Sequence, residues 1–152
     1  MTSVSSSEAI ELEVRVAAKA ETIFPFLIDG SKVSQWFGAE ANVEPRPGGI
    51  YKVKINNQAT ALGEMVEIDP NKRVVFTFGW EGQEPHNGIA PGSSRVEISL
   101  TPDGDATIVR LVHTGLPGPA AGDHRKGWEL YLGRLTEVAE GRDPGRDPNA
   151  QV

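Results

Sequence analysis

One histidine stands where its side chain could perform acid–base chemistry inside the protein. His113 comes late in the run 106–114, on the same alternation as Val109 and Leu111. A strand places alternate residues on one face, so we expect these three side chains to face inward together. An imidazole titrates near neutrality and could orient a ligand or move a proton. The alternative, more common for a buried histidine, is a structural side chain that bonds a loop carbonyl.

The other reactive groups do not form a recognisable catalytic or metal site. His86 and His124 are expected in solvent, and the three histidines lack the spacing of a zinc motif. The absence of cysteine rules out a disulfide, a thiolate nucleophile and Cys-ligated zinc. Glu64 and Glu67 lie three positions apart in one predicted strand, hence on opposite faces, so they are not a paired acid and base. We therefore expect no metal and no cofactor.

The segment Arg46-Pro-Gly-Gly49 could be mistaken for an anion-binding loop, because successive backbone amides can form a nest. The Lys-Ser/Thr pair of a phosphate loop does not follow it. We interpret it as a turn in which glycine adopts a positive φ before a strand begins at Ile50. A Gly-x-Ser-x-Gly nucleophile elbow is also absent.

Large apolar side chains predict a lined cavity instead of a reactive centre. Trp80, Trp128 and Tyr131 each carry a polar atom that needs a partner when buried, so they suit a partly wet wall. For any single one of the apolar residues, ordinary core packing is the alternative. The residues predicted to line an apolar site are Phe26, Trp36, Phe37, Val53, Phe76, Phe78, Trp80, Leu111, His113, Trp128, Tyr131 and Leu132.

The elements that would position these residues follow from periodicity. Alternating apolar residues predict about seven strands in all, among them 10–16, 51–55, 60–68, 73–80, 96–100 and 106–114. Two short helices are expected between the first two of these, over 20–29 and from 30 to 37, and the apolar face of Trp128, Leu132 and Leu135 marks a long terminal helix. Consecutive hairpin-linked strands are antiparallel, so the predicted class is α+β.

Composition bounds the domain and its partners. We expect one domain over 9–140, with a disordered N-terminus at 1–8 and a disordered C-terminal tail at 141–152. Loop 81–92 is a candidate lid. The formal net charge of −6 opposes nucleic-acid binding, and no segment is long and apolar enough to cross a membrane. The lack of cysteine and of a signal-peptide pattern favours the cytoplasm.

The order and spacing of these features resemble the SRPBCC or START-like superfamily. Within it, the chain is similar to the C-terminal domain of the activator of heat-shock-protein-90 ATPase. The resemblance runs from Ile10 to about Val138. The matching positions are Trp36, Arg46-Pro-Gly-Gly49, Gly63-Glu-Met-Val-Glu-Ile-Asp-Pro70, Phe76-Thr-Phe78, Trp80, Val96 to Leu100, Thr107, Leu111, His113, Gly127-Trp128, Leu132 and Leu135.

The resemblance implies a helix-grip fold, in which a curved antiparallel sheet of about six or seven strands wraps around a long C-terminal helix. It also implies a histidine at position 113 in many relatives. Members of the superfamily bind lipids, aromatic polyketides, plant hormones or a chaperone, so the fold alone does not define an activity.

The leading hypothesis is a binding protein for a small apolar, aromatic or lipid-like molecule held in an internal cavity. One alternative is a cyclase-, aromatase- or hydrolase-like enzyme that uses His113 with Tyr131 or a nearby carboxylate as acid and base. A second alternative is a chaperone-associated interaction domain, as the resemblance implies. The resemblance also implies that a homodimer is one possible assembly, because many relatives self-associate.

Overall fold

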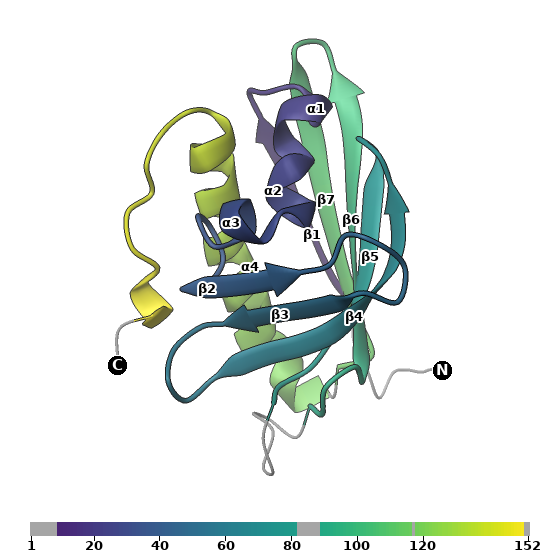
Figure 1. Ribbon diagram of the computed structural model, residues 1–152. Coiled ribbons are helices and arrows are strands. Elements are labelled where there is room, and N and C mark those ends of the chain that lie inside the picture. The colour runs from purple at the N-terminus through teal and green to yellow at the C-terminus, as the bar shows by residue number, and fades with distance from the viewer. Residues whose placement is uncertain (1–8, 82–88, 117, 151–152) are drawn as a thin grey trace.

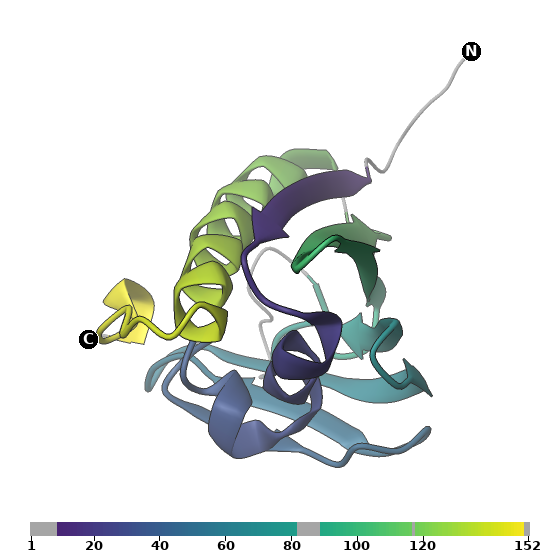
Figure 2. The same ribbon diagram turned by 90° about the horizontal axis from the view of Figure 1, so that it is seen from above.

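A curved antiparallel sheet forms most of the protein, and a long helix lies along its concave side (Figures 1 and 2). The computed structural model describes residues 9–81, 89–116 and 118–150, without the side chains of 118–120 and 150. In this part of the chain the sheet has seven strands in the order β1-β7-β6-β5-β4-β3-β2. The predicted α+β helix-grip architecture is therefore confirmed.

Most elements match the predicted ranges. The strands are β1 (Ile10–Val16), β2 (Glu40–Val43), β3 (Ile50–Lys54), β4 (Thr60–Asp69), β5 (Arg73–Phe78), β6 (Ser94–Asp103) and β7 (Ala106–Thr114). The helices are α1 (Ala20–Ile23), α2 (Pro25–Ile28), α3 (Gly30–Val33) and α4 (Gly118–Ala139), followed by the short 3-10 helix η2 (Pro148–Ala150).

The connection between β1 and β2 differs from the expected pair of helices. It contains three helical segments of four residues each. Pro25 lacks a backbone donor and so starts a new segment at the first helical position. Asp29 then adopts extended geometry, and its side chain accepts a hydrogen bond from the amide of Ser31, which begins α3. β2 itself was not predicted, because its four residues show too short an alternation.

The sheet curves because β4 serves two neighbours in succession. Its first half pairs with β3 and its second half with β5, with a register irregularity between Met65 and Glu67. Gly63 makes this bend possible, since a Cβ there would overlap the backbone carbonyl of Thr77. The amide of Glu64 next to it donates to the Thr77 hydroxyl at 2.9 Å.

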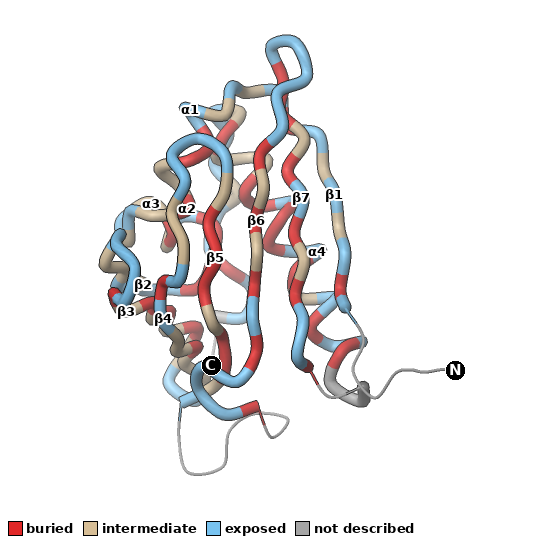
Figure 3. Tube along the Cα trace, turned by 90° about the vertical axis from the view of Figure 1, so that its right-hand side faces the viewer, coloured by how far each residue is buried: buried red, intermediate tan, exposed pale blue. Residues whose placement is uncertain are grey.

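The concave face of the sheet and one side of α4 form the core. Buried and exposed positions alternate along the strands, as the coloured trace in Figure 3 shows. Trp128, Leu132 and Leu135 of α4 are at most 3% exposed, as their spacing predicts. The turn predicted at Arg46-Pro-Gly-Gly49 is present, with Gly48 at a φ of 85°.

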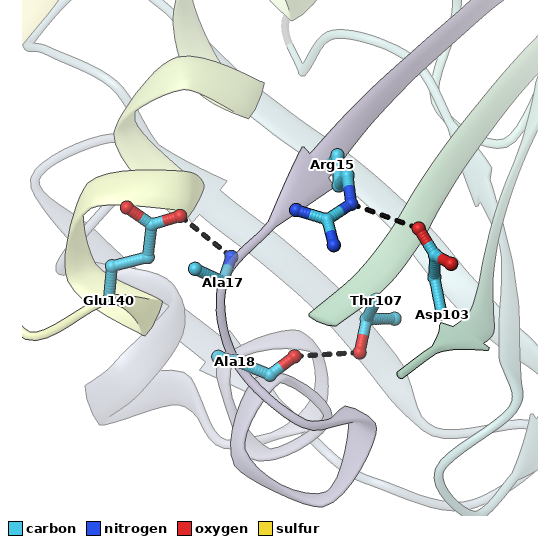
Figure 4. A network of polar contacts seen from close by, with 6 residues as sticks. All are labelled: Arg15, Ala17, Ala18, Asp103, Thr107 and Glu140. Atoms are coloured by element: carbon cyan, nitrogen blue, oxygen red, sulfur yellow. Dashed lines mark hydrogen bonds and ion pairs between the residues drawn. The ribbon is translucent and has the colours of Figure 1, made fainter. Parts of the chain in front are cut away.

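The C-terminal end of α4 is tied to the chain between β1 and α1 (Figure 4). The Oε2 atom of Glu140 accepts a hydrogen bond from the amide of Ala17 at 2.7 Å, and the next carbonyl, of Ala18, accepts from the Thr107 hydroxyl. Close by, Arg15 on β1 forms an ion pair with Asp103 at the end of β6, on the far side of β7. The Ala17 amide, with Arg142, lowers the pKa of the Glu140 carboxyl.

The C-terminal segment follows α4 and falls in the range for which a disordered tail is predicted. Residues 141–150 lie against the body of the protein, and Asp147 is only 2% exposed. Residues 1–8, most of the loop 81–92 and residues 151–152 fall outside the described part of the chain, so the expectations for them stay predictions. Among the described helices, none has the length and apolar character needed to span a membrane.

The bend at Gly63 gives a first test. Gly63→Ala places a methyl group against a backbone carbonyl, so we expect it to lower the free energy of unfolding by about 2 kcal/mol or more. The matched control is Gly122→Ala on α4, where a Cβ meets nothing within 4 Å. We expect this substitution to raise the free energy of unfolding by about 0.5 to 1 kcal/mol. Urea unfolding measures both changes. Equal stability of the two variants would contradict this account of the sheet's curvature.

Candidate functional site

A cleft of about 450 Å³ opens between α4, the end of β5, the β3–β4 turn and the C-terminal segment. One wall comes from α4 and the opposite wall from the sheet. The lining residues are Phe37, Ile55, Asn56, Ala59, Phe78, Trp80, Asp123, His124, Gly127, Trp128, Tyr131, Pro148 and Asn149. This cleft lies between the terminal helix and the sheet, at one end of their interface, and it is open to solvent on one side.

Aromatic rings from the sheet side and from α4 line the cleft together. Phe37 lies 4.7 Å from Tyr131 and 5.3 Å from Trp128 between ring centroids. Phe78 meets Trp80 edge-on at 5.4 Å and lies 5.9 Å from Trp128. These separations fit the favourable tilted and edge-to-face arrangements, so the rings support one another and hold the wall in shape.

A buried chain of hydrogen bonds fixes Trp128. Its Nε1 donates to Nδ1 of His113 at 2.9 Å, and Nε2 of His113 lies 2.8 Å from the hydroxyl of Ser94. That hydroxyl donates to the carbonyl of Phe78 at 2.7 Å. An indole nitrogen can only donate, so Nδ1 must accept and the imidazole proton must reside on Nε2, which donates to Ser94. Every group in the chain is satisfied in the neutral tautomer.

His113 faces inward as predicted, but it lies behind the cleft wall and is fully buried. Burial, with a smaller contribution from the nearby His124, lowers the pKa of His113 to about 3. The imidazole is therefore neutral at physiological pH. The His113 ring on β7 bonds Trp128 of α4 and Ser94 of β6, and so it orients the Trp128 ring. Both of its nitrogens have hydrogen-bond partners within the protein.

His124 contradicts the expectation of a solvated side chain. It is 8% exposed, lines the cleft and accepts a hydrogen bond at Nε2 from Nε1 of Trp80 at 3.1 Å. A signal for this was present in the sequence, since His124 precedes Trp128 by four residues and so shares its face of α4. The Trp80 indole meets a polar partner at the cleft, as expected of a wall tryptophan.

The hydroxyl of Tyr131 is held by the C-terminal segment. It donates to Oδ2 of Asp147 at 2.8 Å and accepts from Nδ2 of Asn149 at 3.2 Å. Burial raises the pKa of Tyr131, so the phenol stays protonated and able to donate. The prediction that this polar atom needs a buried partner is thus met by residues expected to be disordered.

The remaining predicted ligand residues do not line the cleft. Val53, Phe76, Leu111 and Leu132 are at most 1% exposed and fill the core. Phe76 stacks on Tyr51 at a centroid distance of 3.9 Å, which occupies the space under the middle of the sheet.

Trp36 and Phe26 also lie away from the cleft. The buried Nε1 of Trp36 donates to the carbonyl of Phe26 at 2.8 Å, and the Phe26 ring lies under the ammonium of Lys32. Among the described residues, no group of His, Asp and Glu side chains is arranged to hold a metal ion.

The sheet, the gripping helix and the aromatic cleft define a helix-grip protein of the SRPBCC type. The chain belongs to the family of activator of Hsp90 ATPase homolog 1-like proteins, whose family model matches residues 17–140. An AHSA1-like protein from Rhizobium etli is 44% identical, with 93% of this chain and 88% of that chain covered at a TM-score of 0.72. The resemblance predicted from the sequence is confirmed.

Two more distant structures show the same fold. The Aha1 dimer from Colwellia psychrerythraea is 18% identical, covering 88% of this chain and 97% of that one at a TM-score of 0.75. DynU16, from the dynemicin biosynthetic locus, is 23% identical at a TM-score of 0.77. The match covers 91% of this chain but only 49% of DynU16, so this chain spans about half the length of that relative. A search of curated proteins finds no match.

The buried His113 predicts a specific pH dependence. Its pKa is about 3 in the folded protein against an ordinary 6.5, so the unfolded chain binds one more proton between these values. Stability from this group is intact above pH 6.5 and declines below it by up to about 1.4 kcal/mol per pH unit until pH 3. We expect His113→Gln, which can donate and accept but does not titrate, to lose this part of the acid sensitivity.

Urea unfolding of both proteins at pH 7 and pH 4.5 measures the effect. Carboxylates titrate in both, so only the difference between the two proteins counts. Wild type should lose about 2 to 3 kcal/mol more than His113→Gln over this range. Parallel losses would show that His113 is not buried as a neutral group.

Proposed function

We propose that this protein binds a small, largely apolar aromatic molecule in the cleft beside α4. The single observation that supports this most strongly is an open space of about 450 Å³ walled by Phe37, Phe78, Trp80, Trp128 and Tyr131. This volume falls within the range of small-molecule sites, which are mainly apolar with a few placed polar groups. Phe76 and Tyr51 stack on each other in the core and do not line this space, which supports the cleft as the proposed ligand site.

The chemistry of the wall favours a flat ligand. Aromatic faces and edges around one space bind a planar ring system through stacking and edge contacts. Asn56, Asp123, His124 and Asn149 add polar atoms beside these rings and can orient hydroxyl or carbonyl substituents. One structural relative comes from the biosynthetic locus of a small molecule, dynemicin, which agrees with a small-molecule ligand.

The position of His113 favours binding over catalysis by this residue. To act as an acid or base, the imidazole would have to leave its hydrogen bonds to Trp128 and Ser94. A ligand in the cleft meets the ring of Trp128 first, and His113 acts on it by holding that ring in place. His113 is thus a positioning residue in this proposal.

The outer surface favours a small ligand over a chaperone partner. Among the described residues, the exposed large apolar side chains are Val66 and Leu130, which lie on β4 and α4. Two separate residues do not make the contiguous apolar patch that marks a docking surface.

For its setting, we propose a cytoplasmic protein that forms a homodimer, as the Aha1 relative from Colwellia psychrerythraea does. Analytical ultracentrifugation tests the assembly, and a single species of 16.3 kDa would reject the dimer.

Gly127 provides a direct test of the cleft. It lines the space, and a Cβ at this position would meet nothing within 4 Å, so Gly127→Leu should project into the cleft without a clash. Gly133 is the matched control, because it is an exposed glycine on the same helix with equally open surroundings. Replacing either helical glycine should leave the fold intact.

The assay is native mass spectrometry and tryptophan fluorescence against fatty acids, flavonoids and polyketide-like aromatics. We expect a planar aromatic to bind wild type and Gly133→Leu equally and to bind Gly127→Leu at least about tenfold more weakly. Binding should quench tryptophan emission, because Trp80 and Trp128 line the cleft. A ligand that binds both leucine variants equally would place the site elsewhere, and failure of the whole panel to bind would reject the proposal.

A further inference from the structure

The C-terminal segment 141–150 forms one end of the cleft. After α4 it turns back and runs beside the helix toward the ends of β2 and β3, as the yellow trace in Figures 1 and 2 shows. Pro148 and Asn149 line the cleft. The carbonyl of Asn149 accepts a hydrogen bond from Nδ2 of Asn56 in the β3–β4 turn at 2.9 Å. The segment therefore spans from the end of α4 to the sheet side of the cleft.

One buried carboxylate holds this segment in place. The Oδ2 atom of Asp147 accepts hydrogen bonds from the amide of Gly38 at 2.9 Å and from the hydroxyl of Tyr131 at 2.8 Å. Its Oδ1 atom accepts from the amide of Asn149 at 2.8 Å, which shapes the turn that presents Asn149 to the cleft. Asp147 is 2% exposed, so these bonds are shielded from water.

Arg134 of α4 provides a second attachment. It is 6% exposed, and its guanidinium donates to carbonyl groups on two separate segments. Nε donates to Trp36 at 3.0 Å, and Nη2 donates to Gly145 at 2.9 Å. Further donations reach the carbonyls of Gln35, Pro144 and Arg146. A buried arginine thus joins the turn after α3 to the C-terminal segment.

The segment is held by these polar contacts and hardly by apolar burial. Gly141, Arg142, Asp143, Gly145 and Arg146 are all exposed. A second cavity of about 660 Å³ lies between residues 141–147, the chain after α3, and Arg134 and Val138 of α4. Because the segment buries little apolar surface, loss of these polar contacts should let it open while the sheet and α4 stay folded.

We propose that residues 141–150 are the specificity wall of the ligand cleft and that Asp147 is the positioning residue that holds this wall. With the wall attached, the cleft accepts a short aromatic ligand. With the wall released, the cleft extends past Pro148 and Asn149 and accepts ligands that carry a long apolar chain. This inference rests on the proposed ligand-binding function and names the feature that limits ligand length.

The first part of the test needs no ligand. In Asp147→Ala, amide hydrogen exchange in 143–149 should rise by about tenfold or more, while exchange in β6 and β7 stays unchanged. Asp143→Ala is the matched control, because among the described residues this exposed carboxylate accepts a hydrogen bond only from the amide of Gly145, within the segment. Exchange in Asp143→Ala should stay close to wild type away from that turn. Unchanged exchange in Asp147→Ala would overturn the role of Asp147.

The second part uses prodan and laurdan, two neutral fluorescent probes with the same naphthalene ring. Prodan carries a propionyl chain and laurdan a dodecanoyl chain, so they differ only in apolar length. We expect Asp147→Ala to raise the affinity for laurdan by about tenfold and to change that for prodan by less than about threefold. Asp143→Ala should bind both probes as wild type does. Only binding that Gly127→Leu removes counts as binding in the cleft.

The outcomes separate this inference from the proposed function. If exchange rises in Asp147→Ala but the laurdan-to-prodan affinity ratio stays that of wild type, the wall does not set ligand length and the inference fails alone. If neither probe binds wild type or any variant in the cleft, the proposed function fails, and the inference fails with it.

Discussion

The hydrogen-bond chain from Trp128 through His113 and Ser94 to the carbonyl of Phe78 is the constraint on which the site depends. It spans α4, β7, β6 and β5, and it fixes both the distance of the helix from the sheet and the orientation of an aromatic wall. Because each donor meets one acceptor in a single tautomer, the arrangement has no equivalent alternative. A misplaced helix would leave buried polar atoms without partners, which is costly.

Such a fixed core is compatible with an adaptable end. Phe76 and Tyr51 stack on each other in the core, whereas the cleft lies beside the 123–131 part of α4, between that helix, the β3–β4 turn and the C-terminal segment. The rings there are held by one another and by His113 and His124, while the segment opposite is held by Asp147 and Arg134 through polar contacts. The protein thus combines a wall of packed aromatic rings with a wall held by the polar contacts of two buried side chains.

Most of the fold could be predicted from the sequence because its elements follow local periodicity. Alternation in 10–16 and 106–114 identifies strands and an inward His113, and the spacing of Trp128 and Leu132 identifies the buried face of α4. The four residues of β2 were too short a pattern to recognise. The resemblance to a known family added the topology, which periodicity alone does not give.

The site was only partly predictable, because its geometry depends on contacts between distant residues. Phe37, Phe78, Trp80, Trp128 and Tyr131 line the cleft, whereas Val53 and Leu111 share the inward direction but meet packed neighbours. The alternation of a strand determines which side chains face inward. Whether free space lies beside them depends on packing between distant segments, which the alternation does not show. The bond from Gly38 to Asp147 joins positions 109 residues apart, so no local pattern in the sequence indicates this contact.

The chain's three tryptophans allow the most direct test of the central claim, that a ligand occupies the aromatic cleft. Trp80 and Trp128 line the cleft, whereas the Trp36 indole is buried elsewhere and bonded to the Phe26 carbonyl. In a titration with prodan followed by NMR of the indole N–H groups, the signals of Trp80 and Trp128 should move together while that of Trp36 moves least. A titration in which the Trp36 signal moves most, or in which all three stay fixed, would contradict the account.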